Sequence, residues 1–173
     1  MSKLRAGLLN ISRRYICTSR LPRPISVAPM VDITTPSFLE LLNIISGKDR
    51  YNYYTEMYHC QAILHHADHL DRFVGTPRSN VVVQLGGSNP DDMARAAKIL
   101  EEYGYSEVNL NVGCPSQNVQ SGMFGAILMK TPHVVADILS AMEKNNVRIP
   151  VTVKCRIGVD RQDNFEFLHT FVI

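Results

Sequence analysis

Apolar and polar positions follow two alternating periods from Ile25 to the end of the chain. Short runs rich in β-branched and aromatic residues, typical of strands, are separated by longer segments whose apolar residues recur at helical spacing. The runs predict five strands, at Ile25–Pro29, Tyr51–Met57, Asn80–Leu85, Glu107–Val112 and Pro150–Arg156. Strands that are joined by helices pair in parallel through right-handed crossovers. The pattern therefore predicts an α/β protein built on a parallel sheet.

Three of the intervening helices share one start signal, a polar capping residue followed by proline at the first helical position. The three signals are Thr35-Pro36, Asn89-Pro90 and Thr131-Pro132. In the helix that follows Asn89, two acidic residues, Asp91 and Asp92, suit the positive end of the helix dipole. Gly104 is expected to end that helix, because glycine readily adopts the left-handed conformation of a helix C-terminus.

The pattern allows two parallel architectures, a closed TIM (β/α)8 barrel and a doubly wound sheet. In the doubly wound dinucleotide-binding fold, a Gly-rich phosphate loop usually follows the first strand. Here the first strand continues into VAPMVDITTP, which contains no glycine, and no Walker-type loop occurs elsewhere in the sequence. The barrel is therefore the better interpretation.

A TIM barrel usually needs roughly 250 residues and eight strands, whereas the chain has 173 residues and five predicted strands. The last residues fall inside a predicted helix that begins near Asp163. We therefore expect residues 24–173 to be the N-terminal part of a longer barrel, present as a truncated gene model or a natural short form.

Residues 1–23 form a separate basic segment, with six basic residues, no acidic residue, and Leu4, Leu8, Leu9 and Ile11 available for one helix face. This composition predicts a mitochondrial or plastid transit peptide. The alternatives are a disordered basic leader and a stretch upstream of the true start codon, and a protein without a transit peptide would be cytoplasmic. The other 12 basic residues and the 16 acidic residues give the remaining chain a net charge of −4, which offers no electrostatic footprint for nucleic acid. No run approaches the roughly 20 apolar residues of a membrane span.

Polar side chains share one face of the last three predicted strands, opposite the apolar residues of the same strands. They are Gln84, Asn109, Asn111, Thr152, Lys154 and Arg156. A lysine within a buried parallel strand is costly unless an anion or a polar ligand meets it. Lys154 is therefore either a functional residue or an edge-strand lysine that reaches solvent.

Cys114 directly follows the fourth predicted strand, between Gly113, which ends the strand, and Pro115, which restricts the turn. Loops at strand ends commonly carry the chemistry of α/β enzymes, although a small buried thiol is the alternative. The four cysteines have no paired spacing, so neither a disulfide framework nor a zinc site is indicated. The cluster of histidines between His59 and His69 is interpreted as helix surface and not as a metal site.

Five motifs occur in order from about Ile25 to the end of the chain: SVAPMVD, YTEM, VVVQLGG, NLNVGCPS with GMFGA after it, and VTVKCRIG. Together they resemble the tRNA-dihydrouridine synthases, which are flavoenzymes on a TIM barrel, and the spelling is nearest the DusA-type branch. The resemblance implies FMN as cofactor, NADPH as reductant and tRNA as substrate. A related alternative is a flavin barrel oxidoreductase of the dihydroorotate dehydrogenase type, and a further one is an inactive fragment with no turnover.

The resemblance also implies how the flavin is held. Pro29 and Met30 would lie against the flavin with Val31 beside them, and Gln84 and Lys154 would hydrogen-bond the isoalloxazine ring. A lysine near the N1/C2 edge is physically reasonable, because reduced flavin carries negative charge there. In the family, the FMN phosphate is held by loops that follow the last barrel strands, and tRNA is held largely by a C-terminal helical domain.

For the reaction, the resemblance implies reduction of the uracil C5–C6 bond of a uridine that is flipped out of the RNA stack. Cys114 would be the general acid, since a thiol is protonated at neutral pH and still acidic enough to donate a proton. Asn111 would hold the uracil edge, and Arg156 would contact uracil or a phosphate. Glu56 is interpreted as a supporting carboxylate, and Met123-Phe124 as either a loop over the substrate pocket or a packing turn.

Overall fold

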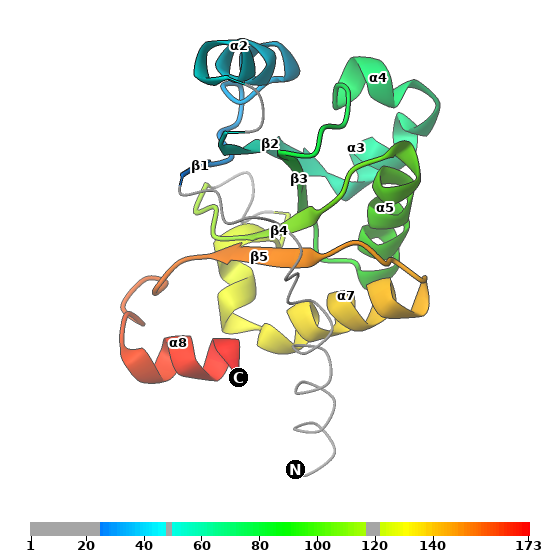
Figure 1. Ribbon diagram of the computed structural model, residues 1–173. Coiled ribbons are helices and arrows are strands. Elements are labelled where there is room, and N and C mark those ends of the chain that lie inside the picture. Colours follow the sequence, from blue (N-terminus) through cyan, green and yellow to red (C-terminus); the bar gives the residue numbers. More distant parts are fainter. Residues whose placement is uncertain (1–24, 48–49, 117–121) are drawn as a thin grey trace.

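The computed structural model describes residues 25–47, 50–116 and 122–173 (Figure 1). Its centre is a five-stranded parallel sheet in the order β1-β2-β3-β4-β5. The strands are β1 (Ser26–Val27), β2 (Asn52–His59), β3 (Val81–Gly86), β4 (Val108–Val112) and β5 (Val151–Cys155). All five predicted strands are therefore confirmed. The predicted transit peptide lies outside the described residues and stays a prediction.

The strand order separates the two architectures that the sequence allowed. Each strand pairs with the strand that follows it in the chain, whereas a doubly wound sheet reverses its order at a switch point. Helices α3, α5 and α7 follow one another along one side of the sheet (Figure 1), and α5 contacts both of the others. The described part of the chain is thus a curled half of a TIM barrel.

The three helices with predicted start signals, α2, α5 and α7, begin at the predicted prolines, and the structure adds further helices. The described helices are α2 (Pro36–Ser46), α3 (Cys60–His65), α4 (Leu70–Phe73), α5 (Pro90–Tyr103), α7 (Pro132–Lys144) and α8 (Phe165–Val172), with short 3₁₀ turns η1 (Ala67–His69) and η2 (Gly125–Lys130). The Thr35 hydroxyl accepts from the Phe38 amide, and the Asn89 side chain accepts from the Asp92 amide. Thr131 precedes α7 without a side-chain capping bond. Gly104 ends α5 at φ 118°, in the left-handed region that favours glycine.

The apolar core lies between the sheet and the helices. Leu85 and Leu110, from the outward face of the central strands, are buried together with Leu100 of α5 and Ile138 of α7. Full burial of such a side chain stabilises the fold by about 1.5–3 kcal/mol. Since the apolar positions are used on the helix side, the polar positions of the same strands face the interior of the half-barrel.

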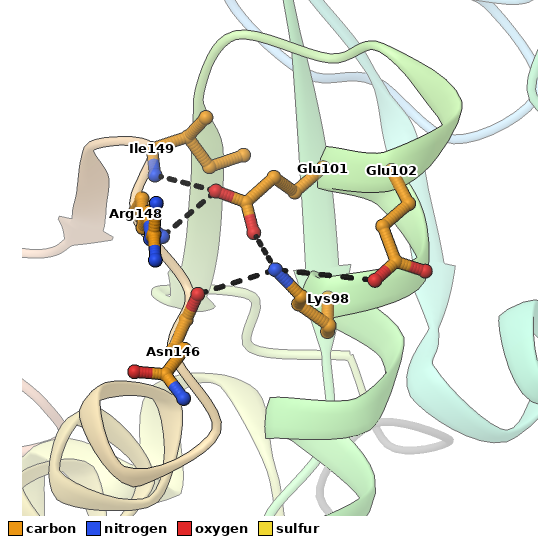
Figure 2. Close-up of polar contacts among 6 residues, drawn as sticks. All are labelled: Lys98, Glu101, Glu102, Asn146, Arg148 and Ile149. Carbon is orange, nitrogen blue, oxygen red and sulfur yellow. Dashed lines mark hydrogen bonds and ion pairs between the residues drawn. The ribbon is translucent and has the colours of Figure 1, made fainter.

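A cluster of polar contacts joins α5 to the loop before β5 (Figure 2). This loop precedes β5, whereas Cys114 follows β4, so the two lie at opposite ends of the parallel strands. The Glu101 carboxylate accepts hydrogen bonds from the backbone amides of Arg148 and Ile149, at 2.8 and 3.1 Å, and from Lys98 Nζ at 2.7 Å. Lys98 also donates to the carbonyl of Asn146 at 3.2 Å. Burial acts to raise the pKa of the Glu101 carboxyl, but Lys98 and the two amides outweigh it and hold the pKa below its ordinary value. The cluster fixes the start of the strand that carries Lys154.

Candidate active site

A cavity of about 690 Å³ lies at the carboxyl ends of the strands. Its lining contains seven of the eight residues that the sequence predicted for the site: Pro29, Val31, Gln84, Asn111, Cys114, Lys154 and Arg156. Met30 does not line the cavity, and its contact with a flavin stays a prediction. The polar side chains that strand parity predicted to share a face, among them Gln84, Asn111 and Lys154, therefore meet in one cavity. The cavity lies at the end of the barrel where catalytic residues usually lie.

Cys114 is held through its backbone. The Asn111 side-chain oxygen accepts from the amides of Gly113 and Cys114, at 3.2 and 2.9 Å. The Cys114 carbonyl accepts from the Ala126 amide at 2.9 Å, where the loop returns to the sheet. The thiol is half-buried, with its sulfur 3.6 Å from the hydroxyl of Ser116. A backbone that is fixed on both sides leaves the Cys114 side chain at the edge of the cavity with a defined direction.

Gln84 and Asn111 form one connected amide pair from adjacent strands. Gln84 is 1% exposed, and its side-chain oxygen accepts from Asn111 Nδ2 at 2.9 Å. Its backbone amide donates to the buried Thr55 hydroxyl at 3.1 Å. A buried amide such as that of Gln84 is tolerated only when it is hydrogen-bonded. Its bond to the half-buried Asn111 joins the two side chains, and Asn111 in turn contacts the Cys114 turn.

The basic side of the cavity comes from β5 and the residues after it. Arg156 Nη1 donates to the Gly113 carbonyl at 3.4 Å, which places its guanidinium beside the Cys114 turn. Lys154 is exposed on the edge strand of the described sheet and also lines the cavity. Both interpretations of Lys154 thus have structural support. Within the described residues its ammonium forms no ion pair, which leaves it available to a ligand.

Two apolar wall residues, Met57 and Phe124, were not among the predicted site residues. A Cβ atom on Gly86 would lie 2.8 Å from both the Met57 sulfur and the Phe124 ring, so glycine is required for this close packing. Phe124 is 7% exposed, and its ring lies edge-on to His59 with centroids 5.1 Å apart. Met123 is exposed instead. The Met123-Phe124 segment therefore both packs and borders the cavity.

Glu56 forms hydrogen bonds with the loop after β1, in agreement with its interpretation as a supporting carboxylate. Its side chain accepts from the Asp32 amide at 3.0 Å, and its backbone amide donates to the Thr34 carbonyl at 3.1 Å. Asp32 has φ 60°, a conformation that is uncommon outside glycine but tolerated by aspartate. The bond from Glu56 holds the loop that carries Pro29 and Val31.

Among the described residues, the other cysteines and the histidines form no comparable site. Cys155 is half-buried and lies on the opposite face of β5, in a separate, largely apolar cavity between α7 and α8. In the part of the chain that the structure describes, no group of three or more His, Cys, Asp or Glu side chains could hold a metal ion. Over the same residues, no helix has the length and apolar character needed to cross a membrane.

A half-barrel of parallel strands with a cavity at their carboxyl ends has the architecture of TIM-barrel enzymes. The family described as dihydrouridine synthase (Dus) matches residues 26–172. The chain belongs to this family.

Curated relatives carry a name of the same kind. The chain is 47% identical over 156 residues to a tRNA-dihydrouridine(20/20a) synthase of Shewanella oneidensis, covering 90% of this chain and 45% of that protein. It is 49% identical over 150 residues to the protein of that name from Synechocystis, covering 86% and 44%. For the Escherichia coli K12 protein of that name, identity is 48% over 148 residues, covering 85% and 41%. The chain thus spans about half the length of the curated relatives it matches.

Proposed function

We propose that this chain is part of an FMN-dependent tRNA-dihydrouridine synthase, which reduces the uracil C5–C6 bond of uridine in tRNA with NADPH as reductant. Residues 24–173 would supply the N-terminal part of its barrel. The observation that carries the proposal is the placement of the Cys114 thiol beside the Gln84 and Asn111 amides in one cavity. The relatives are named tRNA-dihydrouridine(20/20a) synthases, which supports the tRNA-dihydrouridine synthase part of the proposal.

The residues of the cavity fit a flavin ring. Gln84 is a buried, rigidly held amide, and Lys154 is a cation without an ion-pair partner among the described residues. These groups suit the carbonyl oxygens and the negatively charged edge of a flavin. Pro29 and Val31 provide an apolar surface, and Met30 is proposed to join them. When bound, FMN would supply hydride chemistry.

The chain's own residues would manage the proton and the base. Cys114 would donate its Sγ proton to C5 of the uracil, because a neutral thiol can act as a general acid. Asn111 would hold the uracil edge through its side-chain amide, and Arg156 would contact the uracil or a phosphate of the RNA. The uridine must leave the RNA stack to reach these groups, as other base-modifying enzymes require.

The experiment that tests the proposal compares substrates for the complete protein that contains this sequence. Purified protein with FMN and NADPH is incubated with unmodified tRNA, and dihydrouridine is measured by mass spectrometry of the nucleosides. Dihydrouridine is the expected product. Turnover of a free pyrimidine without any change in the tRNA would contradict the proposal and would favour the dihydroorotate dehydrogenase type of enzyme.

We also propose that residues 1–23 direct the protein to mitochondria or a plastid, since the segment has six basic residues and no acidic one. The segment is fused to a fluorescent protein and observed in cells, and organellar fluorescence is expected. A matched fusion in which the six basic residues are changed to glutamine is expected to remain in the cytosol. Cytosolic fluorescence from the unmodified fusion would show that the segment is no transit peptide.

A further inference from the structure

A layer of polar side chains crosses the inside of the half-barrel below the cavity. Gln84, Asn109 and Thr152 are register partners on β3, β4 and β5. In TIM barrels such interior layers are usually filled by bulky branched apolar residues. Asn109 is 3% exposed and Gln84 is 1% exposed, so this layer would be costly if its members were not hydrogen-bonded.

The hydrogen bonds of this layer form one continuous chain with a single direction. Starting at the cavity, the Cys114 amide donates to Asn111 Oδ1 at 2.9 Å, and Asn111 Nδ2 donates to Gln84 Oε1 at 2.9 Å. Gln84 Nε2 then donates to Asn109 Oδ1 at 2.7 Å, and Asn109 Nδ2 donates to the Thr152 hydroxyl at 2.9 Å. The last bond runs from the Thr152 hydroxyl to the Glu107 carboxylate at 2.9 Å.

The groups at the two ends of this series of hydrogen bonds, the Cys114 amide and the Glu107 carboxylate, determine its direction. A backbone amide can only donate, and an ionised carboxylate can only accept, whereas a side-chain amide or a hydroxyl can face either way. If the Thr152 hydroxyl donates to Glu107, its oxygen must accept from Asn109, and the orientations of Asn109 and Gln84 follow. At the other end, the amides of Gly113 and Cys114 require the oxygen of Asn111. One arrangement satisfies every bond.

This arrangement decides which atoms remain for a ligand. The Asn111 oxygen already accepts two hydrogen bonds, while Gln84 Nε2 and Asn111 Nδ2 each keep a second N–H. Both side chains line the cavity, together with the cations Lys154 and Arg156. The cavity therefore offers mainly donors, which match ring ligands with carbonyl oxygens.

We propose that Asn109, supported by Thr152 and Glu107, is a positioning residue that sets the amide orientation of Gln84 and, through Asn111, steadies the backbone of Cys114. It thereby selects ligands that present carbonyl acceptors. The identity of the ligand as FMN rests on the proposed function, but the orientation of the amides does not.

The test uses hydrogen exchange and FMN affinity in purified variants of the complete protein. Asn109→Leu keeps a similar volume and removes both hydrogen bonds. We expect exchange of the Gly113 and Cys114 amides to become about tenfold faster, relative to the change at the buried Leu100 amide of α5. FMN affinity, measured by quenching of flavin fluorescence, is expected to fall about tenfold.

Two further substitutions keep the test decisive if Asn109→Leu does not fold. Thr152→Val is expected to show a smaller increase in the same exchange rates, about threefold, and Thr152→Ser is expected to restore the wild-type values because it keeps the hydroxyl. Thr131→Val removes a hydroxyl that makes no capping bond and serves as the matched control, with no expected change.

The outcomes separate this inference from the proposed function. An equal increase in exchange at Leu100 and at the Cys114 turn, or no increase at all, would overturn the positioning role. If the wild-type protein binds no FMN and Asn109→Leu still shows faster exchange confined to the Cys114 turn, the positioning role would be supported and the proposed function contradicted.

Discussion

The surroundings of Cys114 differ from those of the other two cysteines in the described residues. Cys60 is buried, and burial raises the pKa of its thiol. Cys155 is on the opposite face of β5 from the cavity. Only Cys114, among these three, combines partial exposure with a place in the cavity that holds Gln84 and Lys154.

At the residue scale, Cys114→Ala is expected to lower dihydrouridine formation by about 10²–10⁴-fold, the usual contribution of a general acid. FMN binding should remain, because the backbone bonds that hold the turn do not involve the thiol. The measurement is single-turnover reduction of tRNA by the protein with FMN and NADPH. Cys155→Ala is the matched control and should leave the rate of tRNA reduction nearly unchanged. Wild-type rates in Cys114→Ala would show that the thiol only packs.

At the element scale, the Glu101 cluster joins α5 to the loop that leads into β5 (Figure 2). The Glu101 side chain is 13% exposed. The side chain of Glu102, in the same helix turn, is 67% exposed, and its carboxylate lies 3.9 Å from Lys98 Nζ. The hydrogen bonds from the two backbone amides to Glu101 should dominate, since exposed ion pairs contribute little.

Glu101→Gln is expected to lower the free energy of unfolding by about 1–3 kcal/mol, as hydrogen bonds to a charged group usually do. The measurement is urea denaturation followed by circular dichroism. Glu102→Gln is the matched control, and its effect should be within about 0.5 kcal/mol. An equal loss in both variants would contradict the importance of the backbone bonds.

The difference in free energy of unfolding between wild type and Glu101→Gln should depend on pH in one direction only. Because the pKa of Glu101 is lower in the folded protein than its ordinary value of 4.5, its contribution to stability is fully present above that ordinary value. The contribution is lost as the pH falls through the lower, folded pKa. The difference between wild type and Glu101→Gln should therefore be constant above about pH 5 and should shrink below about pH 4. A difference that grew on acidification would contradict the assignment.

At the scale of the whole molecule, the described sheet has two edge strands, β1 and β5, with unpaired backbone groups. Apolar side chains are also exposed, including Ile44 and Ile45 on α2 and Phe165 on α8. Open edges and apolar patches favour aggregation or self-association. A closed barrel has no such edges.

We therefore expect the 173-residue chain, expressed by itself, to give colourless aggregates or oligomers without turnover. The measurement combines size-exclusion chromatography, the visible absorption of bound flavin, and the tRNA reduction assay. The complete protein that contains this sequence is the control and should be yellow and soluble. A monomeric, flavin-bound 173-residue protein that reduces uridine in tRNA would contradict this expectation.

The sequence by itself determined the elements and the faces of the strands. Strand periodicity and the signals at Thr35, Asn89 and Gly104 act within a few neighbouring residues, so they are readable from the chain, and the structure confirms them. Parity along single strands was enough to place Gln84 and Asn111 in the cavity.

The tertiary structure alone decided what depends on register and on distant contacts. Asn109 shares a strand face with Asn111, but only the alignment of β3, β4 and β5 places it below the cavity, between Gln84 and Thr152. Phe124 enters the cavity wall because Gly86, 38 positions earlier, leaves room for its ring. Glu101 meets amides 47 and 48 residues further along the chain. Local pattern carries no information about such pairings, because they are set by how the elements pack.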